Sequence, residues 1–307
     1  MARVKVRRTN REELPGIAVL RDAAAADIPA FPSSHGILDL EMDVDPDLNH
    51  LITHDPDGFF TAVEKDETLG FAATHVRSLQ CVLSEFWVLP QHRGRGAGES
   101  LLSRVLTYGE RSGAREFLAM VPAEANVQAL LLRHGFTPIA PVFLFALSPA
   151  VADELASALT RLYPGQDVTS DLLIRRGQAD LDRLDRVNRN ITREVDHIYW
   201  LKERGLRAAF VQQGSRNAAY AYGGAGQIGP VAGSTQNAAL AALGWAIRFA
   251  LDARAGEDIE LRVPAPFTSA IEALDDSGAR LRSTLMLYGK GLALSFDRYL
   301  PGPVSLP

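Results

Sequence analysis

Apolar positions in the first half of the chain repeat with the periods of strands and helices. The segments Gly58–Glu64 and Leu69–Val76 are mostly apolar and are joined by a short polar turn, which predicts a β-hairpin. Val82–Leu89 predicts a third strand, and Pro90 ends it. In Glu99–Ser112 the apolar residues fall at helical spacing and form one stripe. The other elements expected in this half are strands at Ala2–Arg8, Glu116–Val121 and Thr137–Leu147 and helices at Glu12–Ala26, Leu38–His54 and Ala125–His134.

The second half of the chain repeats this order of strands and helices. Its expected strands are Leu172–Arg175, Leu206–Gln212, Ala218–Tyr222, Ile228–Val231, Ile259–Val263 and Ser283–Tyr288, and its expected helices are Asp180–Ile191, Thr192–Arg204, Gln236–Arg254 and Phe267–Leu274. An order that occurs twice predicts an α+β or α/β fold of two tandem domains, residues 1–148 and 169–307, with a connector at 149–168. The hairpins favour a mixed, mostly antiparallel sheet flanked by helices in each domain over a doubly wound parallel sheet.

Composition narrows the class of protein. The chain has 307 residues and a net charge of −5, and its acidic and basic residues are interspersed, so no nucleic acid is expected as a partner. The single cysteine, Cys81, excludes a disulfide within the chain and lies in an apolar segment, which predicts a buried thiol. The seven histidines lack metal-ligand spacing, so no metal site is expected.

No membrane contact is expected either. The N-terminal residues contain no apolar signal-peptide core, and a bilayer span needs about 20 apolar residues. The most apolar helical segment, Ala238–Ile247, is shorter than this and is expected to be a buried core helix. We therefore expect a cytoplasmic protein, either a monomer or a homodimer.

A loop rich in glycine and arginine follows the third strand and runs from Gln91 to Gly98, directly before the helix at Glu99–Ser112. The start of a helix has unpaired N–H groups and the positive end of the helix dipole, so it attracts anions. Glycines let the main chain approach a phosphate and adopt positive φ, and the arginines add charge. Two common phosphate loops are excluded because Gly98 is not followed by Lys, and because Glu99 stands where a dinucleotide loop has its last glycine.

The loop sequence Gln91-His92-Arg93-Gly94-Arg95-Gly96, continued by Ala97-Gly98, resembles the Q/R-x-x-G-x-G/A loop of the GNAT acyltransferase superfamily. The lead-in Glu85–Pro90 is similar to the family's fourth strand, and Gly135-Phe136 is similar to the end of its fourth helix. The likeness spans Val4–Leu147, and the second half resembles the degenerate copy of tandem GNAT proteins.

The resemblance implies acetyl-CoA as co-substrate and a small-molecule amine as acceptor, which attacks the thioester directly. The loop amides from Arg93 to Gly98 would hold the coenzyme pyrophosphate, and the main chain of Val88 and Leu89 would pair with the pantetheine arm. The cofactor-binding residues implied in this way are Val88, Leu89, Gln91, Arg93, Gly94, Arg95, Gly96, Ala97 and Gly98. Glu85 is the candidate general base. A leucine, Leu131, replaces the family's usual tyrosine acid.

Two alternatives to an N-acetyltransferase stay open at this point. One is a coenzyme A-binding sensor without turnover, and the other is an acyltransferase similar to mycothiol synthase. In the second half, Pro230 lacks an N–H group and the loop before the next helix is short, so no second anion site is expected. The tyrosines of this half could line an acceptor pocket or pack in the core.

Overall fold

The computed structural model describes residues 4–26, 28, 45–65, 67–168, 177–224, 227–254, 256–303 and 306–307. Contacts within the chain divide it into two compact units. The first unit comprises Met1–Phe31, Leu38–Ile139 and Met286–Ala293, and the second comprises Pro32–Ile37, Ala140–Leu285 and Leu294–Pro307. The domain limits 1–148 and 169–307 stay a prediction.

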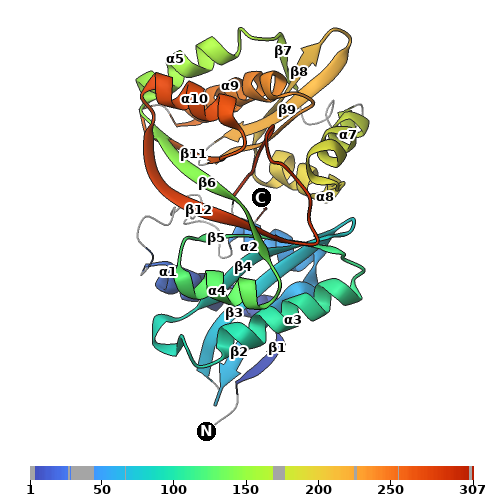
Figure 1. Ribbon diagram of the computed structural model, residues 1–307, viewed down its shortest axis with the longest axis vertical. Helices are drawn as coiled ribbons and strands as arrows, with labels where there is room; N and C mark the ends of the chain where they lie inside the picture. Colours follow the sequence, from blue (N-terminus) through green and yellow to red (C-terminus); the bar gives the residue numbers. More distant parts are fainter. Residues whose placement is uncertain are drawn as a thin grey trace. The chain divides into compact units, whose positions relative to one another are not determined.

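The first unit is a twisted sheet with helices on both faces (Figure 1). Its strands are β1 (Lys5–Arg8), β2 (Phe59–Glu64), β3 (Glu67–Arg77), β4 (Gln80–Val88), β5 (Glu116–Pro122) and the end of β12 (Arg280–Lys290), in the order β1-β2-β3-β4-β5-β12. Strands β1 to β4 pair in antiparallel fashion, whereas β4 and β5 are parallel. Its helices are α1 (Leu14–Ala25), α2 (Pro46–His54), α3 (Ala97–Arg111) and α4 (Ala125–Arg133). Helices α3 and α4 cover one face of the sheet, and α1 and α2 lie behind it.

The second unit contains a five-stranded antiparallel sheet in the order β13-β10-β9-β8-β7. Its strands are β7 (Gly165–Val168), β8 (Arg207–Gln213), β9 (Arg216–Gly224), β10 (Gln227–Gly233), β13 (Tyr299–Leu300), and the antiparallel pair β6 (Thr137–Leu147) and β11 (Ile259–Pro264). Its helices are α5 (Pro149–Leu159), α7 (Gln178–Arg189), α8 (Glu194–Ile198), α9 (Gln236–Ala253) and α10 (Thr268–Ser277). Helix α9 packs on β8, β9 and β10 and against α5, and most of its apolar residues are buried, so the predicted core helix is confirmed.

The elements agree with the sequence patterns except at a few places. The 149–168 stretch, predicted as a connector, contains helix α5 and strand β7, which pairs with β8. The single helix predicted at Thr192–Arg204 is α8 followed by a π-helical turn, Tyr199–Glu203. The expected strand Leu172–Arg175 and the start of Leu38–His54 lie outside the described residues.

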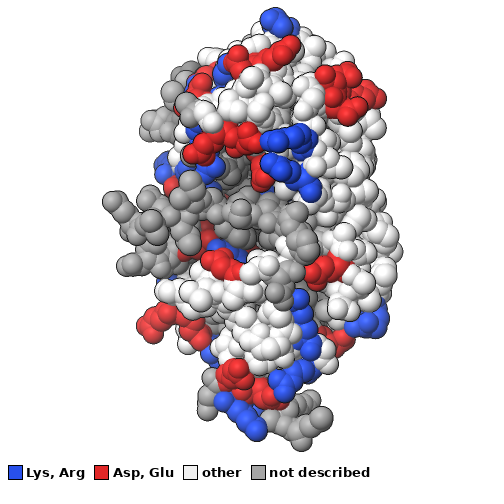
Figure 2. All heavy atoms as spheres, turned by 90° about the vertical axis from the view of Figure 1, so that its left-hand side faces the viewer, with Lys and Arg blue, Asp and Glu red and all other residues white. Residues whose placement is uncertain are grey.

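Two properties of the described residues concern the expectation that neither nucleic acid nor a membrane is a partner. On the face drawn in Figure 2, acidic and basic side chains are interspersed, and those of the described residues form no continuous basic area. Among the helices in the described ranges, none is both long enough and apolar enough to cross a bilayer.

Candidate functional site

The glycine-rich loop connects β4 to α3 and has an open conformation. After Val88 the chain makes a 3-10 turn at Pro90–His92, and α3 begins at Ala97. Gly94 and Gly96 have positive φ of 75° and 86°, as expected, and no atom lies within 4 Å of the Cβ position that either would add. The space beside both glycines is therefore free for a ligand.

Gly98 differs from Gly94 and Gly96 in its main-chain conformation. It lies in the first turn of α3 and is not among the positive-φ glycines. A Cβ at Gly98 would lie 3.5 Å from the side chains of Leu130 and Phe86, which is ordinary van der Waals contact. The prediction of positive φ at Gly98 was wrong because the helix begins one residue before it.

The main-chain N–H groups at the start of α3 are available to an anion. No described residue accepts a main-chain hydrogen bond from the amides of Gly94 through Glu99. The N-cap residue is Gly96, which has no side chain to cap them, and its φ is left-handed. These amides and the positive end of the α3 dipole therefore converge on the open side of the loop. The Arg93 amide differs, because it donates to the Pro90 carbonyl at 3.2 Å.

The polar side chains of the loop are mostly engaged within the protein. Arg93 Nε donates to the Val88 carbonyl at 3.2 Å, and its Nη2 donates to the Ala24 carbonyl at 3.1 Å. Arg95 Nη1 lies 3.2 Å from His92 Nδ1, while Gln91 is exposed. The charge of the arginines is therefore near the loop, but the Arg93 guanidinium is turned back towards α1.

Strand β4 has a partly open edge beside this loop. It pairs with β5 only from Gln80 to Leu83, although both strands continue beyond that point. The register with β3 shifts here, since Ala73 lies opposite Glu85 and Thr74 lies opposite Leu83, which leaves Ser84 as the extra residue of a bulge. The main chain of β4 between the bulge and the loop can therefore accept an additional extended segment.

Glu85 lies directly after the bulge, on the face of β4 that α1 covers. Its side chain is 2% exposed, and Trp87 Nε1 donates to its Oε2. Burial raises the pKa of Glu85 to about 7, and the Arg21 guanidinium opposes this rise. Arg21 is itself fully buried and forms an ion pair of 2.9 Å with Asp45, whose side chain also caps α2 at Leu48 N–H. Glu85 Oε1 has no hydrogen-bond partner among the described residues.

Sequence reasoning missed Arg21, Asp45 and Trp87 as neighbours of Glu85. A signal for Arg21 was present, because it occupies the core-facing stripe of α1 together with Ile17 and Ala24. A charged residue in such a stripe is almost always paired. Asp22 is its neighbour in sequence, but Asp45 and Glu85 could not be found from spacing, since they lie outside α1.

Leu131, at the position where the resemblance implies a tyrosine acid, and Tyr108 are both described by the structure. Leu131 is fully buried in the apolar core, as expected from its residue type. Burial raises the pKa of Tyr108 to about 12, with Asp55 adding to the rise. Tyr108 is half-buried on α3 and packs against the apolar core of the unit.

Cys81 is a buried thiol, as predicted, and we expect it to be unreactive. Its Sγ lies 3.0 Å from Thr74 Oγ1, and burial raises its pKa to about 12 although this contact lowers it. At pH 8 the thiolate is then rarer than in the unfolded chain by about 10³-fold, since an ordinary thiol has a pKa near 8.5. Labelling with a thiol reagent should accelerate by a similar factor on unfolding, and rapid labelling of the folded protein would contradict this.

The second unit lacks a comparable opening at its corresponding strand. Strand β10 pairs with β9 on one edge and with β13 on the other, where Leu300 lies opposite Val231. Helix α9 is capped by its own Thr235, whose side chain accepts from Ala238 N–H at 3.2 Å. Both the strand edge and part of the helix start are therefore already occupied by the chain itself.

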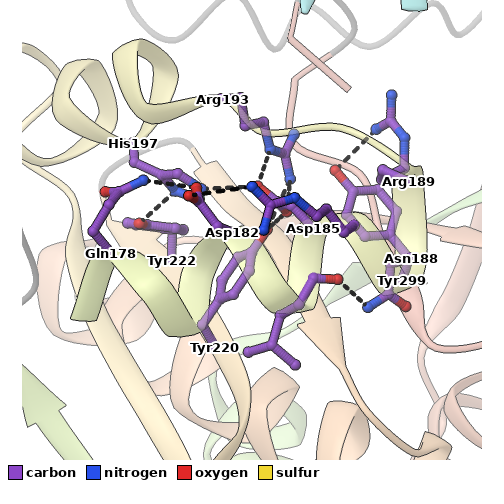
Figure 3. A network of polar contacts seen from close by, with 12 residues as sticks. Gln178, Asp182, Asp185, Asn188, Arg189, Arg193, His197, Tyr220, Tyr222 and Tyr299 are labelled. Carbon is purple, nitrogen blue, oxygen red and sulfur yellow. Dashed lines mark hydrogen bonds and ion pairs between the residues drawn. The ribbon is translucent and has the colours of Figure 1, made fainter. Parts of the chain in front are cut away.

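A buried polar network lies beside β9 in the second unit, with Asp185 of α7 at its centre (Figure 3). Arg193 donates through Nε and Nη2 to both carboxylate oxygens at 3.0 Å, and His197 Nε2 lies 2.9 Å from Oδ2. The Tyr220 hydroxyl donates to the same carboxylate, and the Tyr222 hydroxyl lies 2.8 Å from His197 Nδ1. Burial raises the pKa of Asp185, but Arg193 and His197 outweigh it and hold the pKa well below its ordinary value.

The tyrosines of the second half therefore pack instead of lining an open pocket. Tyr299 is fully buried and accepts from Arg189 Nη1 at 3.1 Å, and the Tyr288 hydroxyl donates to Gln128 Oε1 at 2.9 Å. Sequence spacing gave no sign of this network, because its members come from α7, α8, β9 and β13. Within the described ranges, no three His, Cys, Asp or Glu side chains are grouped to hold a metal ion.

Comparison with known proteins agrees with this geometry. Residues 21–136 match the acetyltransferase (GNAT) family, so the N-terminal part of the chain contains a domain of that family. No curated protein matches the chain.

Solved structures extend the likeness in fold to nearly the whole chain. A Pyrococcus horikoshii protein of proposed acetyltransferase activity has a TM-score of 0.72 at 17% identity, covering 96% of this chain and 92% of its own. A tandem GNAT protein of the clavulanic acid biosynthesis pathway has a TM-score of 0.62 at 15% identity, covering 95% and 99%. A GCN5-related N-acetyltransferase of Sphaerobacter thermophilus has a TM-score of 0.57 at 17% identity, covering 95% and 98%. The fold is therefore that of the tandem GNAT proteins.

Proposed function

We propose that the protein is an acetyl-CoA-dependent N-acetyltransferase that transfers the acetyl group to the amine of a small-molecule acceptor. The observation that carries this proposal is the free start of α3 beside the open edge of β4. The amides from Gly94 to Glu99 have no described main-chain acceptor and would hold the coenzyme pyrophosphate. The glycine conformations keep the space beside these amides open.

The open edge of β4 would bind the pantetheine arm. Leu89 N–H donates to the Leu69 carbonyl of β3 at 3.0 Å, so the main-chain groups of Val88 point to the opposite edge. Val88 N–H is thereby directed at the place where the thioester carbonyl would lie, and would stabilise its developing negative charge. Leu89 lies directly after the strand, and its own N–H group is already bonded to β3.

Glu85 would accept the proton of the attacking amine. A carboxyl group with a pKa of about 7 has the proton affinity that suits general-base assistance at neutral pH. Because its side chain is 2% exposed, proton transfer would pass through a water molecule at Oε1, which lacks a partner among the described residues. The coenzyme thiolate would leave without a proton donor, since a thiol with a pKa near 8.5 gives a stable thiolate.

The burial of Glu85 also favours one alternative, a coenzyme A-binding sensor without turnover. Incubation with acetyl-CoA and a panel of small amines separates the two functions. Amine-dependent release of free coenzyme A thiol supports the acetyltransferase, and binding of acetyl-CoA without thiol release supports the sensor. The buried Cys81 should contribute little background to such an assay.

Gly96→Glu is expected to weaken acetyl-CoA binding by at least about 30-fold, because a carboxylate would enter the space proposed for the pyrophosphate. The measurement is the rise in melting temperature on addition of acetyl-CoA. Gly113→Glu is the matched control, since Gly113 follows the other end of α3 with the same φ of 86° and equally open space. An equal ligand-induced rise in Gly96→Glu and Gly113→Glu would show that the loop assignment is wrong.

A further inference from the structure

Arg93 joins the glycine-rich loop to helix α1. Its Nη2 donates to the Ala24 carbonyl at 3.1 Å, and its Nε donates to the Val88 carbonyl at 3.2 Å. Ala24 is in the last turn of α1, and Val88 is the last residue of β4. One guanidinium therefore holds the end of a helix against the end of the strand beside the loop.

Both carbonyls are suited to this contact. The last four carbonyls of a helix have no partner within it, and the end of the dipole is negative, so a cation is favourable at Ala24. The Val88 carbonyl faces the edge of β4 that pairs with no described strand at this point. A planar guanidinium can donate to both at once, whereas a lysine ammonium is a point charge on a single stem.

Helix α1 also carries the charged neighbour of Glu85. Arg21 lies one helical turn before Ala24 and is fully buried, with an ion pair of 2.9 Å to Asp45 at the start of α2. The Arg21 guanidinium opposes the burial of the Glu85 carboxylate and lowers its pKa. Hydrogen bonds of Arg93 therefore link the loop to α1, and the charge of Arg21 on α1 acts electrostatically on Glu85.

We propose that Arg93 is a positioning residue that couples the occupation of the loop to the placement of α1 and, through Arg21, to the part of the site that contains Glu85. The proposal rests on the proposed function, because the occupant of the loop is taken to be coenzyme A. An occupant that pairs with the main chain of Val88 would contact the same Val88 carbonyl that accepts from Arg93 Nε. Binding of this occupant would therefore affect the Arg93 contact with α1. By linkage, ordering of α1 also favours binding of the coenzyme.

Amide hydrogen exchange, with and without saturating coenzyme A, tests the coupling. In the free protein, Arg93→Ala should speed exchange in the last turn of α1 by about threefold to tenfold, the effect of one or two lost hydrogen bonds. Arg95→Ala is the matched control, since Arg95 is in the same loop and contacts His92 instead of α1. It should leave exchange in α1 unchanged.

Coenzyme A should slow exchange both in the loop and in the last turn of α1 of the wild-type protein. In Arg93→Ala the slowing should remain in the loop and disappear from α1. Arg93→Lys keeps the positive charge but loses the two-branched guanidinium. Hydrogen exchange in α1 of this variant should therefore match that of Arg93→Ala. Wild-type behaviour of Arg93→Lys would show that a single charge is enough and would overturn the claim that the two-branched guanidinium carries the coupling.

The outcomes separate this proposal from the proposed function. If coenzyme A slows no exchange in the wild-type loop, the proposed function fails. If the loop responds but α1 of Arg93→Ala is still slowed by coenzyme A, the coupling through Arg93 fails while the proposed function stands. Unchanged exchange at α1 in ligand-free Arg93→Ala would likewise overturn the Arg93 link alone.

Discussion

Glu85→Gln is expected to lower amine acetylation by at least about tenfold, because general-base assistance typically contributes about 10²–10⁴-fold in rate. Glutamine keeps the size of the side chain and can still accept from Trp87 Nε1, but it cannot take a proton. Acetyl-CoA binding should change little, since the loop amides are untouched. The comparison is of kcat at saturating acetyl-CoA, and a Glu85→Gln protein with full activity at neutral pH would exclude Glu85 as the base.

The pH dependence of the wild-type rate gives an independent readout. Only the ionised carboxylate can accept a proton, so the rate should rise through the Glu85 pKa of about 7, and this limb should be absent in Glu85→Gln. Asp45→Asn is an informative control because asparagine still caps α2. Asp45 raises the Glu85 pKa, so its neutralisation should move the limb to lower pH.

Stability should not explain the loss of activity. The Glu85 pKa is raised in the folded state, so stability is lost as the pH rises from the ordinary pKa of 4.5 to about 7, and a neutral glutamine avoids this loss. At pH 8 the free energy of unfolding of Glu85→Gln should therefore equal or exceed that of the wild type. A marked destabilisation would show that Glu85 is needed for the fold instead of the reaction.

Asp185→Asn is expected to lower the stability of the second unit by about 3–5 kcal/mol, the usual effect of removing one partner of a buried ion pair. Arg193 is 3% exposed and would lose its two charge-assisted hydrogen bonds to the Asp185 carboxylate. Asp182→Asn is the matched control on the same helix, because Asp182 is partly exposed, lies 3.9 Å from the exposed Arg186 and accepts from Gln178 Nε2, which asparagine can also do. It should cost less than about 1 kcal/mol.

The difference in free energy of unfolding between wild type and Asp185→Asn should depend on pH, because folding lowers the pKa of Asp185. Its pKa is lower in the folded state than the value near 3.9 of an unfolded aspartate, so its contribution is present above pH 4 and is lost as the pH falls further. Urea unfolding of wild type and Asp185→Asn between pH 2 and 7 measures the gap between them. The gap should narrow below pH 4, and a constant gap would show that charge does not cause it.

The sequence predicts much of this fold because its patterns are local. The hairpin of β2 and β3, the strand β4 and the apolar stripe of α3 follow from periodicity, and the glycine loop follows from its composition. Strand β7 was missed because Gly165–Val168 has no apolar alternation and is defined by its pairing with β8. Strand β13 was missed because its two residues form a strand only through β10.

The chemistry of the site was predicted less completely for a related reason. Helix-terminal amides can be placed from a strand, a glycine loop and a helix in succession. The environment of Glu85 depends on Arg21, which is 64 positions earlier, and on the β4 bulge. Neither feature can be recognised from the local spacing of residues. The Asp185 network likewise joins α7 to residues of β9 and β13.

Calorimetric titration with acetyl-CoA tests most directly the claim that the first unit holds the coenzyme site. One coenzyme site per chain is expected, because β13 occupies the edge of β10 that corresponds to the open edge of β4. Ligand at about 100 times its Kd should then raise the free energy of unfolding by roughly 2.7 kcal/mol. Two equal sites per chain, or one site of unchanged affinity in Gly96→Glu, would contradict the account.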